Sequence, residues 1–200
     1  MKRFIIFYLF IIVAITLFSK QHNKTSNTNV TTEHAAVVVQ ESCGFSINKI
    51  ACSFTLKNQF GKNIKLHDLI GKVVVLDFST MWCYPCNVAA MSSRDIQKKY
   101  GDDIAYITII AQDEEGKRPT KKKLVKWAKR FWIIAPYVLA ADDKIFMSKK
   151  RQGWDINAWP TFVIIDRKMK IVDYFEGFSK KYVEKKIEEA ASEISLKIQN

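Results

Sequence analysis

Residues 73–86 read VVVLDFSTMWCYPC, a run of aliphatic residues followed by two cysteines in a Cys-x-x-Cys spacing. The consecutive aliphatic residues at 73–76 predict a strand that is buried on both faces. Residues 85–100, which Gly101 follows, predict a helix. Cys83 and Cys86 therefore lie where a buried strand passes into a helix. Two thiols at such a junction can open and close as a disulfide.

The position of Cys83 near the predicted helix N-terminus favours its thiolate form, because unpaired backbone N–H groups and the positive end of the helix dipole stabilise negative charge there. Cys86, one helical turn deeper, can attack the same sulfur and resolve a mixed disulfide. Pro85 fits the first turn because it needs no N–H partner. The alternatives are two buried cysteines or half of a zinc site. Cys43 and Cys52 are too widely spaced to supply the second close pair of a four-thiolate site.

Three segments resemble the thioredoxin superfamily, and they occur in the order that family has. Residues 77–86 (DFSTMWCYPC) resemble the active-site signature, residues 158–166 (AWPTFVIID) the cis-proline loop, and residues 176–180 (EGFSK) the glycine turn before the last helix. Together they cover the chain from about residue 53 to its end. Within the superfamily, the chain is most similar to exported or membrane-tethered thiol-disulfide oxidoreductases of the TlpA/ResA type.

The resemblance implies a thioredoxin-like α/β fold, with a mixed central sheet, helices on both faces and an additional N-terminal β-hairpin at residues 54–62. A short helical turn is expected near residues 66–70. Hydrophobic patterning independently predicts alternating strands and helices, which typify such a sheet. The strands are expected at residues 72–79, 104–111, 137–140, 161–165 and 170–175, and the helices at 85–100, 119–132 and 179–198.

The resemblance and the chemistry together assign roles to the site residues. An acid buried beneath the dithiol has a raised pKa and can accept a proton from the resolving cysteine. Apolar residues beside the nucleophile and the backbone of the cis-proline loop can hold an extended substrate segment. We therefore expect Cys83 as nucleophile, Cys86 as resolving cysteine, Asp77 as proton acceptor, and Trp82, Tyr84, Trp159 and a cis Pro160 as substrate-binding residues.

The N-terminus predicts export. Lys2 and Arg3 precede an apolar run at residues 4–18, the arrangement of an export signal. Residues 1–19 are expected to form either a cleaved signal peptide or an uncleaved membrane anchor, and both readings stay open. Residues 20–41 are polar and predict a flexible tether, which leaves 42–200 as a single domain. The protein is expected in the periplasm or on the outer face of the cytoplasmic membrane.

Cys43 and Cys52 bring the cysteine count to four, and thiols of an exported protein are usually oxidised. We expect a structural disulfide between them. The alternative is a second redox pair that relays electrons to or from Cys86. Neither cysteine lies at a predicted helix N-terminus, which disfavours the relay.

No cofactor or metal is expected. A copper-delivering relative of this fold would need a histidine downstream of the dithiol, whereas His22, His34 and His67 all precede Cys83. The net charge is +12, and much of it lies in basic clusters at residues 117–130 and 149–151. These clusters could bind anionic lipid or an acidic partner, although a solvated helix face is the commoner explanation. Nucleic acid is not an expected partner of an exported protein.

The sequence therefore predicts an exported protein thiol-disulfide oxidoreductase, whose partners are protein thiols or disulfides and a membrane thiol-electron donor. By analogy with exported relatives, the favoured direction is reduction of disulfides in envelope or secreted proteins, for example during cytochrome c maturation. A disulfide oxidant or isomerase in secreted-protein folding is the close alternative, because the dithiol alone permits either direction. A metal-binding chaperone or a scaffold is the alternative from a different class.

Overall fold

The computed structural model describes residues 43–134, 137–141, 143–146 and 153–192. The expected signal peptide or anchor at 1–19, the tether at 20–41 and the end of the last helix beyond residue 192 lie outside the described residues. Within the described part of the chain, no helix is both long and apolar enough to span a membrane.

A five-stranded sheet forms the centre of the fold, with β3 in the middle because its residues are apolar enough to be buried on both faces. Strands β3, β4 and β5 are parallel, whereas β6 runs antiparallel to β3, and β7 antiparallel to β6. The mixed sheet predicted from the sequence is thus confirmed. The order across it is β5 (Tyr137–Ala140), β4 (Ile104–Gln112), β3 (Val73–Thr80), β6 (Thr161–Ile165) and β7 (Ile171–Glu176).

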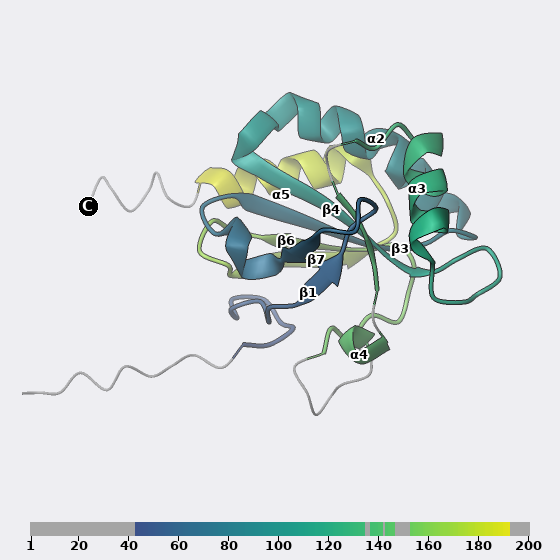
Figure 1. Ribbon diagram of the computed structural model, residues 1–200. Helices are drawn as coiled ribbons and strands as arrows, with labels where there is room; N and C mark the ends of the chain where they lie inside the picture. The colour runs from purple at the N-terminus through teal and green to yellow at the C-terminus, as the bar shows by residue number, and fades with distance from the viewer. Residues whose placement is uncertain (1–42, 135–136, 142, 147–152, 193–200) are drawn as a thin grey trace, which may run out of the picture. The chain divides into compact units, whose positions relative to one another are not determined.

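Helices cover both faces of the sheet, as expected (Figure 1). Helices α2 (Tyr84–Tyr100), α3 (Lys121–Arg130) and α5 (Lys180–Ser192) pack on one face. The opposite face is covered by the short helices η1 (Leu66–Leu69) and α4 (Asp143–Phe146) and by a hairpin of β1 (Thr55–Lys57) and β2 (Asn63–Lys65). A further 3₁₀ turn, η2 (Gly101–Asp103), follows α2.

The main departures from the expected boundaries have local causes. Helix α3 begins at Lys121 rather than at 119, because the Thr120 hydroxyl caps it by accepting a hydrogen bond from the Lys123 N–H at 3.3 Å. The hairpin's second strand lies at 63–65, just beyond the expected span of 54–62. Helix α2 ends at Gly101 as expected, and the φ of +56° there suits glycine.

The first residues of the domain run across the sheet from one edge to the other. At the β7 edge, the Asn48 N–H donates to the Ile171 carbonyl. At the β5 edge, the Gln59 N–H donates to the Val138 carbonyl. Between these points the chain buries Phe54 and neighbouring apolar side chains against the sheet. Both outer strands therefore pair with backbone from this N-terminal segment.

Cys43 and Cys52 are joined by a disulfide, with their Cα atoms 4.8 Å apart. Cys52 is buried, and Cys43 is partly exposed. The closed loop bonds to the turn before β7, since the Ala51 N–H donates to the Met169 carbonyl at 2.8 Å. The disulfide lies in the segment that covers the β7 edge, and neither cysteine lies at the N-terminus of a helix.

Candidate functional site

Cys83 and Cys86 form a disulfide at the start of α2. Cys83 is the N-cap of the helix, and its Sγ accepts a hydrogen bond from the Cys86 N–H at 3.3 Å. Helix α2 begins there because Cys83 has extended backbone geometry and Pro85, in the first turn, needs no N–H partner. Cys83 is 5% exposed and Cys86 is fully buried. An incoming thiol or disulfide can thus reach only Cys83, which is itself largely covered.

The Trp159–Pro160 peptide bond is cis. The carbonyl oxygen of Trp159 lies 3.5 Å from Cys83 Sγ, so the loop brings backbone next to the reactive sulfur. The Trp159 ring packs edge-on against Phe146, with ring centroids 5.6 Å apart. The Trp159 side chain therefore packs against the hydrophobic cluster on the face of the sheet opposite α2, whereas the Trp159 carbonyl lies beside the dithiol. The Pro160 carbonyl accepts from the Gly177 N–H at 2.8 Å, which links this loop to the glycine turn before α5.

Trp82 and Tyr84 flank Cys83 in the sequence, and both side chains are more than half exposed. They provide an apolar surface beside the sulfur. The Trp82 indole N–H donates to Gln112 Oε1 at 3.0 Å, and this contact orients the ring. Gln112 was missed from the sequence. The sequence around Gln112 carries no pattern that points to the site, because only the pairing of β3 with β4 brings Gln112 opposite Thr80.

Asp77 is fully buried in β3, and burial raises the pKa of its carboxyl group from 3.8 to about 7. Hydrogen bonds from three hydroxyl groups partly offset this effect. Ser79 donates at 2.5 Å, and Thr108 and Tyr106 are at 3.3 and 3.4 Å. The carboxyl group therefore titrates near neutral pH, where it can either hold or accept a proton.

The Asp77 side chain points to the same face of the sheet as α2. Side chains alternate along a strand, so Val73, Val75 and Asp77 share one face. Val73 and Val75 pack in a cluster with Ala89 of α2. The carboxyl group thus lies on the face of the sheet that is covered by α2, the helix that carries Cys86.

Asn87 is a second residue that the sequence did not single out. Its amide Nδ2 donates to the Met81 carbonyl at 3.3 Å, and its Oδ1 accepts from the Trp127 indole N–H at 3.1 Å. The residue therefore connects the loop before Cys83 to helix α3. In the sequence, only the position of Asn87 directly after Cys86 indicates that it belongs to the site.

Among the described residues, no group of three or more His, Cys, Asp or Glu side chains could hold a metal ion. His67 is half-buried, with Nε2 2.7 Å from the Ala51 carbonyl oxygen. His22 and His34 lie outside the described residues.

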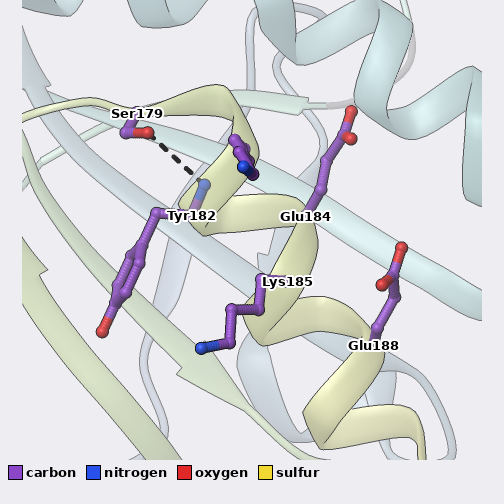
Figure 2. Close-up of a pocket in the computed structure, with 6 residues that line it drawn as sticks. Ser179, Tyr182, Glu184, Lys185 and Glu188 are labelled. Atoms are coloured by element: carbon purple, nitrogen blue, oxygen red, sulfur yellow. Dashed lines mark hydrogen bonds between the residues drawn. The ribbon is translucent and has the colours of Figure 1, made fainter.

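A hollow of about 430 Å³ lies on the outer surface of α5 and in the turn before it (Figure 2). Its walls come from residues 179–188 alone, and none of the expected site residues lines it. Figure 2 shows the Ser179 hydroxyl accepting from the Tyr182 N–H at 3.4 Å, a contact that supports the first turn of α5. The dithiol site is therefore separate from this hollow.

Comparison with known proteins agrees with this geometry. A family model described as the AhpC/TSA family matches residues 47–174. The thiol-disulfide oxidoreductase ResA of Bacillus cereus (strain ZK / E33L) is 28% identical over 131 residues, which cover 66% of this chain and 70% of ResA. A DsbE-like thiol:disulfide interchange protein from Chlorobium tepidum superposes with a TM-score of 0.60 at 24% identity, covering 74% of this chain and 99% of that one. The exposed lipoprotein thioredoxin of Streptococcus pneumoniae strain TIGR4 gives a TM-score of 0.58 at 26% identity, covering 69% and 99%.

Proposed function

Since the chain belongs to the AhpC/TSA family, in the thioredoxin-like branch of thiol-disulfide oxidoreductases, we propose that it acts outside the cytoplasm as a reductase of disulfides in envelope or secreted proteins. Cytochrome c maturation is one process that needs such a reductase. The observation that carries the proposal is the Cys83–Cys86 pair at the N-terminus of α2, of which only Cys83 is exposed at all.

The reaction begins with the reduced dithiol. The Cys83 thiolate attacks one sulfur of a substrate disulfide, so a mixed disulfide forms, the substrate bond breaks and the departing substrate sulfur takes up a proton. Cys86 then attacks Cys83 Sγ and releases the second substrate thiol. Two electrons pass to the substrate, and the enzyme is left with the Cys83–Cys86 disulfide. The Cys86 N–H bond to Cys83 Sγ supports this assignment, because such a donor stabilises a thiolate.

Asp77 is the proposed proton acceptor for the second step. Cys86 must lose its proton to attack, and it is fully buried, where bulk solvent does not reach its thiol. A carboxyl group with a pKa of about 7 is ionised in a useful fraction of molecules near neutral pH, and it binds a proton readily. Its position on the face covered by α2 supports this role.

Substrate binding uses the surface around Cys83. The Trp159 carbonyl, 3.5 Å from Cys83 Sγ, can accept a backbone hydrogen bond from an extended substrate segment. The exposed rings of Trp82 and Tyr84 can cover apolar side chains of that segment. These contacts involve backbone and apolar surface, so they suit a protein substrate more than a small molecule.

Export is supported by three observations of different kinds. Lys2, Arg3 and the apolar run at residues 4–18 have the pattern of an export signal. A structural disulfide between Cys43 and Cys52 suits an oxidising compartment. The pneumococcal relative is named as an exposed lipoprotein. In such a compartment, a membrane protein with a reduced dithiol would return electrons to the Cys83–Cys86 disulfide.

The decisive experiment is the equilibrium reduction potential of the Cys83–Cys86 pair. The protein is titrated against glutathione and dithiothreitol, with Cys43 and Cys52 replaced by serine so that one disulfide is measured. A reduction potential of about −270 mV, as in thioredoxin, supports the proposal that the protein is a reductase. A reduction potential of about −120 mV would instead indicate an oxidant, and a potential of about −180 mV would indicate an isomerase. Failure of the pair to cycle, with stoichiometric metal bound to the reduced protein, would favour a metal chaperone.

A further inference from the structure

An apolar surface lies away from the dithiol, where the turn of the β1–β2 hairpin meets the end of α3. Phe60, Trp132 and Ile134 are 58%, 69% and 74% exposed. They surround a hollow of about 630 Å³ whose other walls include Val125 and Lys129 of α3. Large apolar side chains exposed together in this way mark a surface that contacts something else.

The helix beside this surface is strongly basic. Its sequence, KKKLVKWAKR, contains six cations and no acid. Lys123 is paired with acids of the preceding loop, among them Asp113. The other five cations are exposed and form no ion pair with any residue that the structure describes.

The cations and the apolar side chains lie on one continuous stripe. Positions three or four apart share a helix face, so Lys122, Lys126 and Lys129 align along α3. Lys129 and Trp132 both line the hollow, so the apolar side chains adjoin the C-terminal end of this row. A cationic stripe ending in exposed aromatic and aliphatic side chains has the composition of a surface that lies on a membrane.

We propose that this surface, formed by α3, residues 132–134 and Phe60, binds the surface of an anionic phospholipid bilayer. Lysines along α3 pair with lipid phosphates. Trp132, Ile134 and Phe60 enter the boundary between headgroups and acyl chains, where an indole ring with its polar N–H is well accommodated.

Two other occupants fit the observations less well. A second copy of the chain would bring like-charged helices together, which is unfavourable. An acidic protein would satisfy the charge, but protein interfaces favour arginine and are depleted in lysine. Five of the six cations of α3 are lysine. The attraction of a polybasic surface to anionic lipid needs only charge, so either residue serves.

Hydrogen–deuterium exchange of the full chain on lipid vesicles tests the proposal. Exchange at residues 121–134 is compared on phosphatidylcholine vesicles and on vesicles that also contain phosphatidylglycerol. The apolar N-terminal run can insert into both, so a difference at 121–134 reports this surface alone. We expect slower exchange on the anionic vesicles at low salt, loss of the effect at high salt, and no change at α5.

Two sets of variants separate the charge from the apolar contacts. Replacing both Lys126 and Lys129 with glutamine should weaken binding to the anionic vesicles by up to roughly 25-fold, because each cation near the surface contributes about fivefold. The slowing of exchange at residues 121–134 should fall accordingly. Trp132→Asn with Ile134→Ser should abolish it. Asparagine is chosen because residue 132 has a φ of +56°.

Matched controls use residues outside the surface. Ile70→Ser removes an equally exposed aliphatic side chain, and Lys181→Gln with Lys185→Gln removes two exposed cations of α5. Both should leave the slowing unchanged. Circular dichroism of every variant verifies the fold.

The proposal is overturned if residues 121–134 exchange equally on neutral and anionic vesicles. If exchange at residues 121–134 instead becomes slower as more protein is bound to each neutral vesicle, the surface contacts a second copy of the chain. Slowing by soluble poly-glutamate but not by anionic vesicles would assign the surface to an acidic protein. Either result would replace the lipid as the occupant.

Discussion

Replacing Asp77 with asparagine should make the protein more stable, and more so as the pH rises from 4 to 8. The side chain is fully buried, and burial raises the pKa of its carboxyl group from 3.8 to about 7. In the unfolded chain the same group ionises near pH 4. Between these two pH values the folded state binds a proton that the unfolded state has released, so wild-type stability falls as the pH rises.

The size of the effect follows from the shift. A difference of about three pKa units corresponds to about 4 kcal/mol, at 1.36 kcal/mol per unit. Asparagine carries no charge and avoids this loss. The Asp77→Asn variant should therefore gain about 4 kcal/mol relative to wild type between pH 4 and pH 8, with most of the gain before pH 7. Changes in hydrogen bonding to Ser79 and Thr108 add an offset that does not vary with pH across this range.

The assay is urea unfolding of both proteins across this pH range, with both disulfides oxidised. Asp113→Asn provides a control of opposite sign. The hydrogen bond from Lys123 lowers the pKa of the Asp113 carboxyl group, so that carboxylate stabilises the fold at neutral pH and the contribution is lost in acid. The asparagine variant at 113 should thus be less stable than wild type, with the deficit largest at neutral pH.

A stability difference between Asp77→Asn and wild type that stays constant from pH 4 to pH 8 would refute this account. It would mean that the buried carboxyl group ionises as easily as in the unfolded chain. The proposed role of Asp77 as proton acceptor near neutral pH would then lose its physical basis.

Three further outcomes are expected at other positions. Cys86→Ser should trap a mixed disulfide with substrate, visible as a shifted band on a non-reducing gel; rapid turnover by that variant would exclude Cys86 as the resolving cysteine. Replacing Cys43 and Cys52 with serine should cost roughly 2.5 to 3 kcal/mol in urea unfolding, as a loop of about ten residues predicts, and leave the reduction potential of the active-site pair unchanged. Asn87→Ala leaves the Trp127 indole N–H without its acceptor and should lower stability by about 1 to 3 kcal/mol, whereas a neutral result would show that water replaces the amide.

The sequence predicted best where a local pattern and the tertiary fold agree. Strand β3 was clear because its aliphatic run is buried on both faces, and the end of α2 was clear because Gly101 adopts a positive φ. Strand β5 and strand β6 were predicted with their observed bounds. The strands expected at 161–165 and 170–175 lie close enough in the sequence for the tight turn that the antiparallel β6–β7 pairing requires.

The supporting contacts of the site could not be predicted in the same way. Gln112 meets Trp82 across 30 positions of sequence, and Asn87 meets Trp127 across 40. Such pairs leave no periodic signal, because each depends on how two separate elements pack. The burial of Cys83 could not be predicted either, since a local pattern places the cysteine at a helix start but does not show what covers it.

The segment that crosses the sheet from edge to edge also bears on the order of folding. Asn48 and Ala51 bond to Ile171 and Met169, so the first residues of the domain depend on partners roughly 120 positions later in the chain. They cannot reach their final positions until the β6–β7 hairpin exists. Such long-range pairing slows folding, because the entropy of closing a large loop is lost before the contacts form. The first residues of the domain are therefore expected to stay free of native structure until β6 and β7 have been synthesised and have paired.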